Sequence, residues 1–213
     1  QGSTRYRPRM RSPLPATEPP RDCPLCPRLA EFREEQRAAH PDWFNAPVPS
    51  FGDPQGWLAI AGLAPGLTGA NRTGRPFTGD HAGGLLYATL KKFGLATGEY
   101  DERPDDGLEL TGAIIINSVR CVPPQNKPVP AEIANCEPFL RARIAQLPKL
   151  QVILALGRIA HDSTLKALGA RRSQYPFAHG ARHEVPGAPL LIDSFHCSRY
   201  NTNTRRLTPE MFR

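Results

Sequence analysis

The sequence predicts a single α/β domain whose parallel sheet is covered by helices on both faces. Short apolar runs, each long enough for a buried strand, alternate along the chain with segments of helical length. The length of 213 residues suits one domain with a full core. A hydrophobic content of 39% and a charged content of 22% are typical of a globular protein.

The chain is basic, with a formal net charge of +7 and an isoelectric point of about 9.5. A basic surface favours an anionic partner such as nucleic acid, although a protein that merely happens to be basic is an open alternative. No apolar run reaches the ~20 residues that a membrane span needs. We therefore expect no membrane contact, a cytoplasmic location with activity at the nucleoid, and a monomer.

The N-terminal residues differ in composition from the rest of the chain. Residues 1–21 are rich in Arg, Pro and Ser and poor in apolar side chains, which predicts a flexible arm ahead of one domain over 22–213. The first half of that domain is expected to contain a helix at 28–40, a Pro-rich connection at 41–55, a strand at 57–61, a glycine-rich loop at 62–84, a helix at 85–93 and a polar surface loop at 97–110.

The second half continues the alternation of strands and helices. It is expected to contain a strand at 113–119, a Pro-rich loop at 120–130, a helix at 131–146, a strand at 151–156, a helix at 157–168 and a strand at 190–193. Ligands of open parallel sheets bind beyond the carboxyl ends of the strands. Three segments rich in polar residues follow such ends, at 62 onward, 117–121 and 196 onward, and this predicts one shared site.

Four of the five cysteines form a candidate metal site. Cys23 and Cys26 are spaced as CxxC, and Cys121 and Cys136 could complete a set of four thiolates. Four thiolates fit tetrahedral zinc or an iron–sulfur cluster, and the spacing does not choose between them. Buried cysteines without a ligand are a third possibility. Cys197 lies in the last loop, and we expect it beside the pocket and not on the metal.

Several motifs together resemble the iron–sulfur-containing uracil-DNA glycosylases, most closely their family 5. They are GLAPGLTGANRTGRPFTGD (62–80), NSVRCVPPQNKP (117–128), the four cysteines and HCSRYNTNTRRLT (196–208). The resemblance implies a three-layer α/β/α sandwich with a central four-stranded parallel sheet. It also implies a structural [4Fe-4S] cluster on Cys23, Cys26, Cys121 and Cys136, and hydrolysis of the N-glycosidic bond of uracil in DNA, single- or double-stranded, to leave an abasic site.

The same resemblance assigns a pocket for a base that is flipped out of the duplex. Phe77 would stack on the base, and Asn117 would pair with it, since an amide matches the N3 donor and the O4 acceptor of uracil but not the reversed pattern of cytosine. Gly62, Ala64 and Gly66 would line this pocket. Core packing of Phe77 and capping of a strand end by Asn117 are the competing interpretations.

Two further residues are candidates for the chemistry. Glycosidic cleavage passes through an oxocarbenium-like transition state with an anionic leaving base. Asp80 is the nearest carboxylate for stabilising the cation or orienting water, and His196 is the candidate donor to O2 of the base. The competing interpretations are that Asp80 caps the following helix and that His196 is an ordinary loop histidine.

The chain departs from its relatives at two positions of the first motif. Better-known uracil glycosylases have an aspartate where Ala64 stands and a tyrosine where Gly66 stands, and family 4 has a glutamate close to Gly66. Water activation therefore falls to Asp80 or to the substrate. The missing ring also predicts a roomier pocket that accepts hypoxanthine or 5-substituted uracils.

The last loop departs as well. Its usual form is close to HPSPL, whose leucine is wedged into the gap in the duplex. In this chain Cys197 and Arg199 replace the two prolines, and Tyr200 replaces the leucine. Tyr200 is the candidate for filling the gap left in the duplex. The other expected DNA contacts in this loop come from Ser198, Arg199, Asn201, Arg205 and Arg206. Elsewhere Ser118 is expected on phosphate, and Arg72 and Arg75 either on phosphate or holding the first loop in place.

Two other functions compete with base excision. One is a non-catalytic module that binds damaged DNA on the same fold, and the other is a metal-stabilised enzyme acting on small molecules, such as a nucleoside hydrolase. The joint presence of Asp80, Asn117 and His196 disfavours the first, and the arginine-rich last loop disfavours the second.

Overall fold

A computed structural model describes residues 15–213 of the chain. Its main sheet has six strands in the order β1-β5-β2-β6-β8-β7. The middle four run parallel: β5 (Ala113–Asn117), β2 (Leu58–Gly62), β6 (Val152–Leu156) and β8 (Leu190–Ser194). The expected core of four parallel strands is confirmed, but the sheet as a whole has six strands and not the expected four. The antiparallel edges β1 (Phe51–Gly52) and β7 (Arg182–His183) have two residues each, too few for a recognisable strand pattern.

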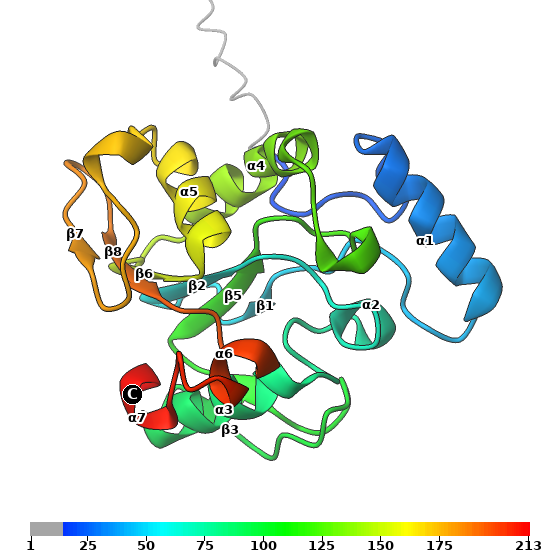
Figure 1. Ribbon diagram of the computed structural model, residues 1–213, viewed down its shortest axis with the longest axis horizontal. Helices are drawn as coiled ribbons and strands as arrows, with labels where there is room; N and C mark the ends of the chain where they lie inside the picture. Colours follow the sequence, from blue (N-terminus) through cyan, green and yellow to red (C-terminus); the bar gives the residue numbers. More distant parts are fainter. Residues whose placement is uncertain (1–14) are drawn as a thin grey trace, which may run out of the picture.

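Helices cover both faces of this sheet, so the three-layer architecture is confirmed (Figure 1). Helix α3 (His81–Lys92) packs on one face, where Leu58 and Ile60 of β2 point into the core. Helices α4 (Pro130–Ala145) and α5 (Arg158–Ala167) pack on the other face, against Ala59 and Ala61. Because side chains alternate along a strand, the fully apolar β2 supplies both cores at once.

Shorter elements surround these layers. Helix α1 (Pro27–Ala39) lies at one side of the molecule (Figure 1). The remaining elements are α2 (Ala70–Thr73), β3 (Ala96–Thr97), β4 (Glu109–Leu110), the turns η1 (Pro124–Asn126) and η2 (Arg172–Gln174), α6 (Arg199–Asn203) and α7 (Pro209–Phe212).

The segment 97–110 is largely the surface loop that its polar sequence predicted, since most of its residues are exposed and 98–108 contains no helix or strand. Strands β3 and β4 form a small antiparallel sheet at its two ends. Leu108 and Leu110 are buried, and the side chain of Asp106 is 1% exposed because it pairs with an arginine of the glycine-rich loop. The burial of this one aspartate was not predicted, because its partner is distant in sequence.

The long predicted helices and strands are present, with shifted ends. The largest shift concerns α3, which begins at His81 and not at residue 85. The carboxylate of Asp80 accepts a hydrogen bond from the backbone N–H of Ala82, and such a cap offsets the weak helix propensity of Gly83 and Gly84.

The strand register brings the predicted polar segments to one edge of the sheet. Gly62 pairs with Asn117 at the ends of β2 and β5, and Leu156 pairs with Ser194 at the ends of β6 and β8. The expected convergence of the three segments is therefore confirmed. Over residues 15–213, no helix combines the length and apolar character that a bilayer crossing requires.

The boundary of the predicted arm stays a prediction, since residues 1–14 lie outside the described range. In the described remainder, Glu18 binds Arg143 and the fully buried Arg120, next to Cys121. Thr17 also accepts a hydrogen bond from Arg120. This end of the arm is thus held against the domain, close to the predicted metal ligands.

Candidate active site

Four of the predicted site residues meet at the edge of the sheet. A Cβ atom on Gly62 would clash with Asn117 Oδ1 and lie 3.1 Å from the ring of Phe77, so a larger residue here would push the amide or the ring out of place. The rings of Phe77 and His196 are stacked, with centroids 5.7 Å apart and an interplanar angle of 28°. An amide, an aromatic face and an imidazole therefore come together from three separate segments.

Asn117 has an unusual environment for a buried amide. Asn117 is only 3% exposed, yet its Oδ1 has no hydrogen-bond partner within the described part of the chain. A buried acceptor without a partner costs about 1–3 kcal/mol, so such atoms call for an explanation. Placed beside the Phe77 ring, Oδ1 is available to accept a hydrogen bond from a planar ligand.

Phe77 combines a packing role with a strained backbone. It is 7% exposed and belongs to the core under α3, so the core-packing interpretation is partly correct. Its φ of 52° lies in the left-handed region, which bulky residues rarely adopt outside functional sites. Tyr100 donates a hydrogen bond of 3.1 Å to the Phe77 carbonyl and helps to hold this conformation.

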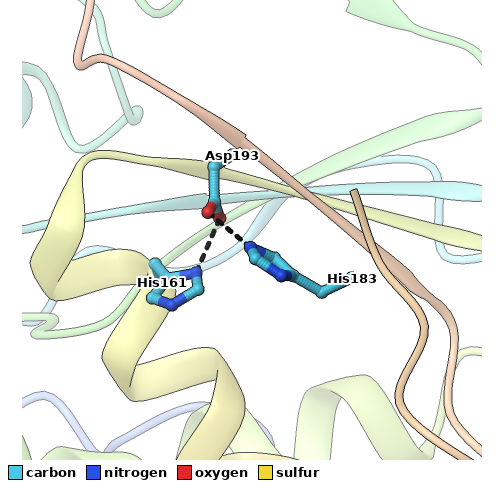
Figure 2. Close-up of side chains that lie close together, drawn as sticks. All are labelled: His161, His183 and Asp193. Carbon is cyan, nitrogen blue, oxygen red and sulfur yellow. Dashed lines mark hydrogen bonds and ion pairs between the residues drawn. The ribbon is translucent and has the colours of Figure 1, made fainter. Parts of the chain in front are cut away.

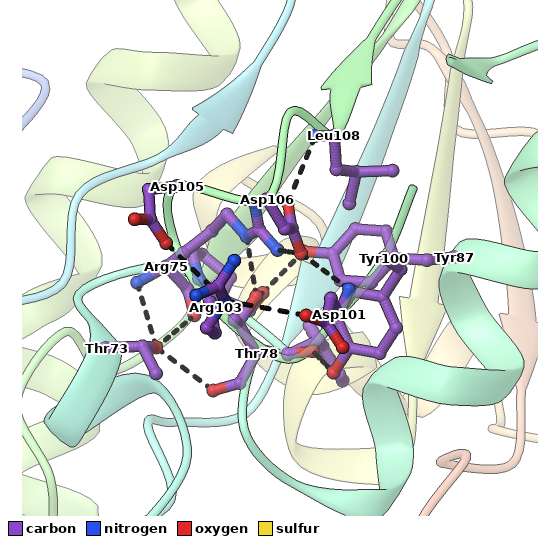
Figure 3. Close-up of polar contacts among 12 residues, drawn as sticks. Thr73, Arg75, Thr78, Tyr87, Tyr100, Asp101, Arg103, Asp105, Asp106 and Leu108 are labelled. Atoms are coloured by element: carbon purple, nitrogen blue, oxygen red, sulfur yellow. Dashed lines mark hydrogen bonds and ion pairs between the residues drawn. The ribbon is translucent and has the colours of Figure 1, made fainter. Parts of the chain in front are cut away.

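The loop around Phe77 rests on a buried ion pair (Figure 3). Arg75 donates to both carboxylate oxygens of Asp106 and to Thr78 Oγ1, and its guanidinium lies over the rings of Tyr87 and Tyr100. Arg75 is 5% exposed. Two roles were predicted for Arg75, and these contacts support one of them: its side chain holds the loop in place and is not available to contact phosphate.

Asp80 divides its two carboxylate oxygens between the helix and the loop. Oδ1 accepts from the N–H of Ala82 at 3.2 Å, so the capping interpretation is confirmed. Oδ2 faces the preceding turn. A Cβ atom added to Gly69 would lie 2.5 Å from Oδ2, and one added to Gly66 would lie 3.2 Å from it. Burial raises the pKa of Asp80 above its ordinary value, although the N–H groups of Gly83 and Ala82 oppose this.

His196 follows β8 directly and is held by its backbone. Asn201 Nδ2 donates to the His196 carbonyl at 2.8 Å, and a Cβ atom added to Gly157 would come into van der Waals contact with the Cβ of His196, at 3.6 Å. Burial lowers the pKa of His196 to about 4, so the imidazole is neutral at pH 7 and keeps one N–H to donate. The amide of Asn201 is therefore engaged in positioning this histidine.

The rest of the last segment forms an exposed basic surface. Ser198 caps α6 by accepting from the N–H of Asn201, and Tyr200 on this helix is 70% exposed. Arg199 and Arg205 are exposed, while Arg206 lies over the Phe195 ring, 4.6 Å from its centroid.

Three other predicted positions lie near the site with less specific contacts. Ala64 is half-buried in the turn after β2. Ser118 is buried and donates to the Gly62 carbonyl at 2.8 Å, so its hydroxyl supports the turn and is not placed to meet phosphate. Arg72 donates to the Thr68 carbonyl at 2.8 Å.

The four predicted metal ligands line one pocket between α1 and α4. Its lining includes Cys23, Cys26, Cys121 and Cys136, together with apolar side chains such as Leu29 and Val119. Three of the sulfur atoms accept N–H contacts, from Arg33, Asn135 and the backbone of Arg120. Burial raises the pKa of the Cys121 thiol to about 12 and that of Cys136 to about 11. Cys197 lies elsewhere, fully buried in the core under α3.

Sequence reasoning missed the contacts that join the motifs. Gly69 sits against Asp80, and His81 Nε2 lies 3.0 Å from Thr202 Oγ1, which ties α3 to α6. The second contact spans 121 positions, and neither residue stands out by type or spacing.

Comparisons with known proteins agree with this geometry. Residues 49–213 match the family model described as the Uracil DNA glycosylase superfamily. The chain is similar to a type-5 uracil-DNA glycosylase of Thermus thermophilus, with 47% identity over 89% of each chain. It is 41% identical to a type-5 uracil-DNA glycosylase of Mycobacterium bovis, over 89% of this chain and 74% of that one. A type-4 uracil-DNA glycosylase of Sulfurisphaera tokodaii is 29% identical, over 78% of this chain and 71% of its own.

Proposed function

Because the chain belongs to the uracil DNA glycosylase superfamily and shares more identity with the two type-5 enzymes than with the type-4 enzyme above, we infer that it is a DNA repair glycosylase. It hydrolyses the N-glycosidic bond between uracil and deoxyribose and leaves an abasic site. The observation on which this rests is the unpartnered Oδ1 of Asn117, within the described chain, beside the stacked Phe77 and His196 rings. A flipped uracil needs an amide partner, an aromatic face and a donor, and those three groups meet here.

Recognition of the base follows from the chemistry of Asn117. Its Oδ1 accepts the N3–H of uracil and its NH2 group donates to O4. Cytosine offers an acceptor at N3 and a donor at its amino group, so both contacts would be lost. The backbone of Gly62 passes close enough to Asn117 and Phe77 to form the wall of the pocket.

Catalysis divides between Asp80 and His196. As the C1′–N1 bond breaks, its electron pair leaves with the base and positive charge grows on the sugar. The Asp80 carboxylate stabilises that charge or orients the water that attacks C1′, and the neutral His196 donates a hydrogen bond to O2 of the departing anion. A neutral donor suits this role because the leaving base needs stabilisation without a full proton transfer.

DNA meets the surface formed by α6 and the residues after it. Arg199, Arg205 and Arg206 contact phosphates, and the exposed ring of Tyr200 fills the space that the flipped base vacates. Ser198 and Asn201 shape this segment from within. Absence of an aromatic side chain from 62–69 supports an added activity on hypoxanthine and 5-substituted uracils. The protein acts as a monomer in the cytoplasm, where its DNA substrate lies.

The cysteine pocket fits a structural [4Fe-4S] cluster on Cys23, Cys26, Cys121 and Cys136. Four thiolates also suit tetrahedral zinc, and the cluster is favoured by the resemblance of the cysteine pattern and the motifs around it to the iron–sulfur-containing glycosylases. When bound, the cluster ties α1 to α4; these residues supply thiolates and N–H contacts to sulfur.

The decisive assay uses the intact protein and a uracil-containing oligonucleotide, followed by alkali. Strand cleavage at uracil, with none at cytosine, is expected, and its rate should fall sharply in Asp80→Asn. Binding of uracil DNA without an abasic product would support the damage-binding module instead. For the metal, a brown protein that absorbs visible light is expected, whereas a colourless zinc protein would refute the cluster.

A further inference from the structure

A second group of metal-ligand side chains lies away from both the base pocket and the cysteines. His161 on α5, His183 on β7 and Asp193 on β8 converge on the α5 face of the sheet (Figure 2). His161 Nδ1 is 2.6 Å from Asp193 Oδ1, and His183 Nε2 is 2.7 Å from Asp193 Oδ2. All three residues are buried, and one ligand atom from each lies within 4.8 Å of the others.

The Asp193 carboxylate requires a positive charge nearby. Its side chain is 0% exposed, and a buried carboxylate without a counter-charge is costly. In residues 15–213 it makes no ion pair with lysine or arginine, and its other contact is a backbone N–H from Ala178 at 3.3 Å. The counter-charge must therefore be an imidazolium or a bound metal ion.

The second ring nitrogen of His161 is fixed by the backbone. Nε2 lies 2.7 Å from the carbonyl of Tyr175, which only accepts, so Nε2 carries the hydrogen. In the neutral ring, Nδ1 then presents its lone pair toward Asp193. A backbone carbonyl on the distal nitrogen is the outer-shell arrangement usual for a metal-binding histidine, because it fixes the tautomer and the ring orientation.

Aromatic side chains enclose the group. The Phe177 ring packs edge-on against His161, and the Tyr175 ring packs edge-on against His183. Such a shell keeps water away and strengthens the interaction between a cation and its ligands. His183 lies on an edge strand and keeps a small exposure of 7%, which gives an ion a route of entry.

We propose that His161 Nδ1, His183 Nε2 and the Asp193 carboxylate bind one divalent transition-metal ion, with zinc the best match. Two imidazoles and one carboxylate are ligands that zinc takes at ~2.0–2.2 Å, and a fourth position stays open for water. When the ion binds, the distance between each imidazole nitrogen and its Asp193 oxygen increases from 2.6–2.7 Å to about 3.3 Å, because metal–ligand bonds of this length at a tetrahedral centre hold their ligands that far apart. It joins α5, β7 and β8 three residues before His196, and is independent of the cysteine pocket.

The test titrates the protein, with its cysteine site already filled, with Co²⁺ and then Zn²⁺. We expect one further equivalent of metal per chain, with visible cobalt d–d bands but no thiolate-to-cobalt charge-transfer band. His183→Gln keeps an N–H for Asp193 but loses the imidazole lone pair, so affinity should fall by about 10- to 100-fold or more. His40→Gln, a histidine at the end of α1, controls for surface binding.

Two further measurements complete the test. Zn²⁺ should raise the Tm of the wild type and of His40→Gln, but not that of His183→Gln. In ¹⁵N NMR, Nδ1 of His161 should lose its proton when Zn²⁺ is added. Absence of extra metal binding, equal binding by His183→Gln, or a His161 ring that keeps both N–H protons with Zn²⁺ present would each overturn the proposal. The last result would identify an imidazolium–carboxylate pair in its place.

Discussion

Arg75 and Asp106 face each other through two parallel N–H···O contacts of 2.8 Å each, and both side chains are almost fully buried. Asp106 also accepts from the backbone N–H groups of Asp101 and Leu108. The glycine-rich loop and the segment 97–110 are therefore one structural unit, and the position of Phe77 depends on both.

Asp106→Asn should destabilise the protein strongly. The change leaves the Arg75 cation buried without its counter-charge, and breaking such a pair costs about 3–5 kcal/mol. Chemical denaturation at pH 7 measures the free energy of unfolding. Asp105→Asn is the matched control, since its side chain is 78% exposed and should change that free energy by about 0.5 kcal/mol or less. Equal effects of the two variants would contradict the assignment.

Asp80→Asn should separate catalysis from folding. Asparagine is as good an N-cap as aspartate, so the Tm should stay close to that of the wild type. The single-turnover rate on uracil DNA should fall by about 10²- to 10⁴-fold, the usual contribution of a positioned acid or base. The same rate, followed against pH in the wild type, should show an acid limb above the ordinary aspartate value of 3.8, because the raised pKa delays ionisation. A variant with the full wild-type rate would remove Asp80 from the mechanism.

The lowered pKa of His196 predicts how the stability of the protein depends on pH. Its pKa is about 4 when folded and 6.5 when unfolded, so between these values the unfolded chain binds a proton that the folded protein does not. The protein should lose stability as the pH falls from about 6.5 to about 4, and His196→Gln should lose less. Denaturation curves at pH 7, 5.5 and 4.5 measure the difference. Parallel losses in both proteins would show that His196 is not held neutral.

Asn117→Ala should lower activity without lowering stability. Loss of the contacts to uracil costs about 1–3 kcal/mol, or about 5- to 150-fold in kcat/KM. The free energy of unfolding should change little, since Oδ1 has no partner to lose within the described chain. Steady-state kinetics and thermal unfolding check the two halves. A clear drop in stability with unchanged kcat/KM would reverse the interpretation and make Asn117 a structural residue.

Tyr200→Ala should affect duplex DNA selectively. The ring is 70% exposed and contributes little to folding, but it can fill the gap opened by a flipped base. Excision from a duplex should slow, while excision from single-stranded DNA, which has no partner strand to hold open, should not. Fluorescence of 2-aminopurine beside the uracil reports the flipping step. Unchanged duplex excision and flipping would assign the wedge to another residue.

The sequence predicted the parts of this molecule that depend on local pattern. The apolar runs 113–116 and 152–156 are recognisable as strands because they pack into the cores on both faces of the sheet and are continuously hydrophobic. The carboxyl ends of parallel strands must share an edge of the sheet, and this rule alone is enough to bring Asn117 and His196 to the same edge.

The rest depends on contacts between distant segments. The burial of Asp106 is decided by Arg75, 31 positions earlier, so the polar composition of this mostly exposed loop does not reveal it. Asp193 and His161 are separated by 32 positions, and the two-residue strand that presents His183 has no pattern of its own. Such features are set by tertiary packing, and propensity alone does not reveal them.

The placement of Asp80 also constrains the size of the residues in the preceding turn. Its Oδ2 fills the space where a side chain on Gly69 would begin and crowds that of Gly66. A side chain at position 69 would therefore have to displace the Asp80 carboxylate, and one at position 66 would crowd it. The small size of these two residues is thus part of what keeps the acid in place, so enlarging either of them should disturb Asp80 without any change at position 80.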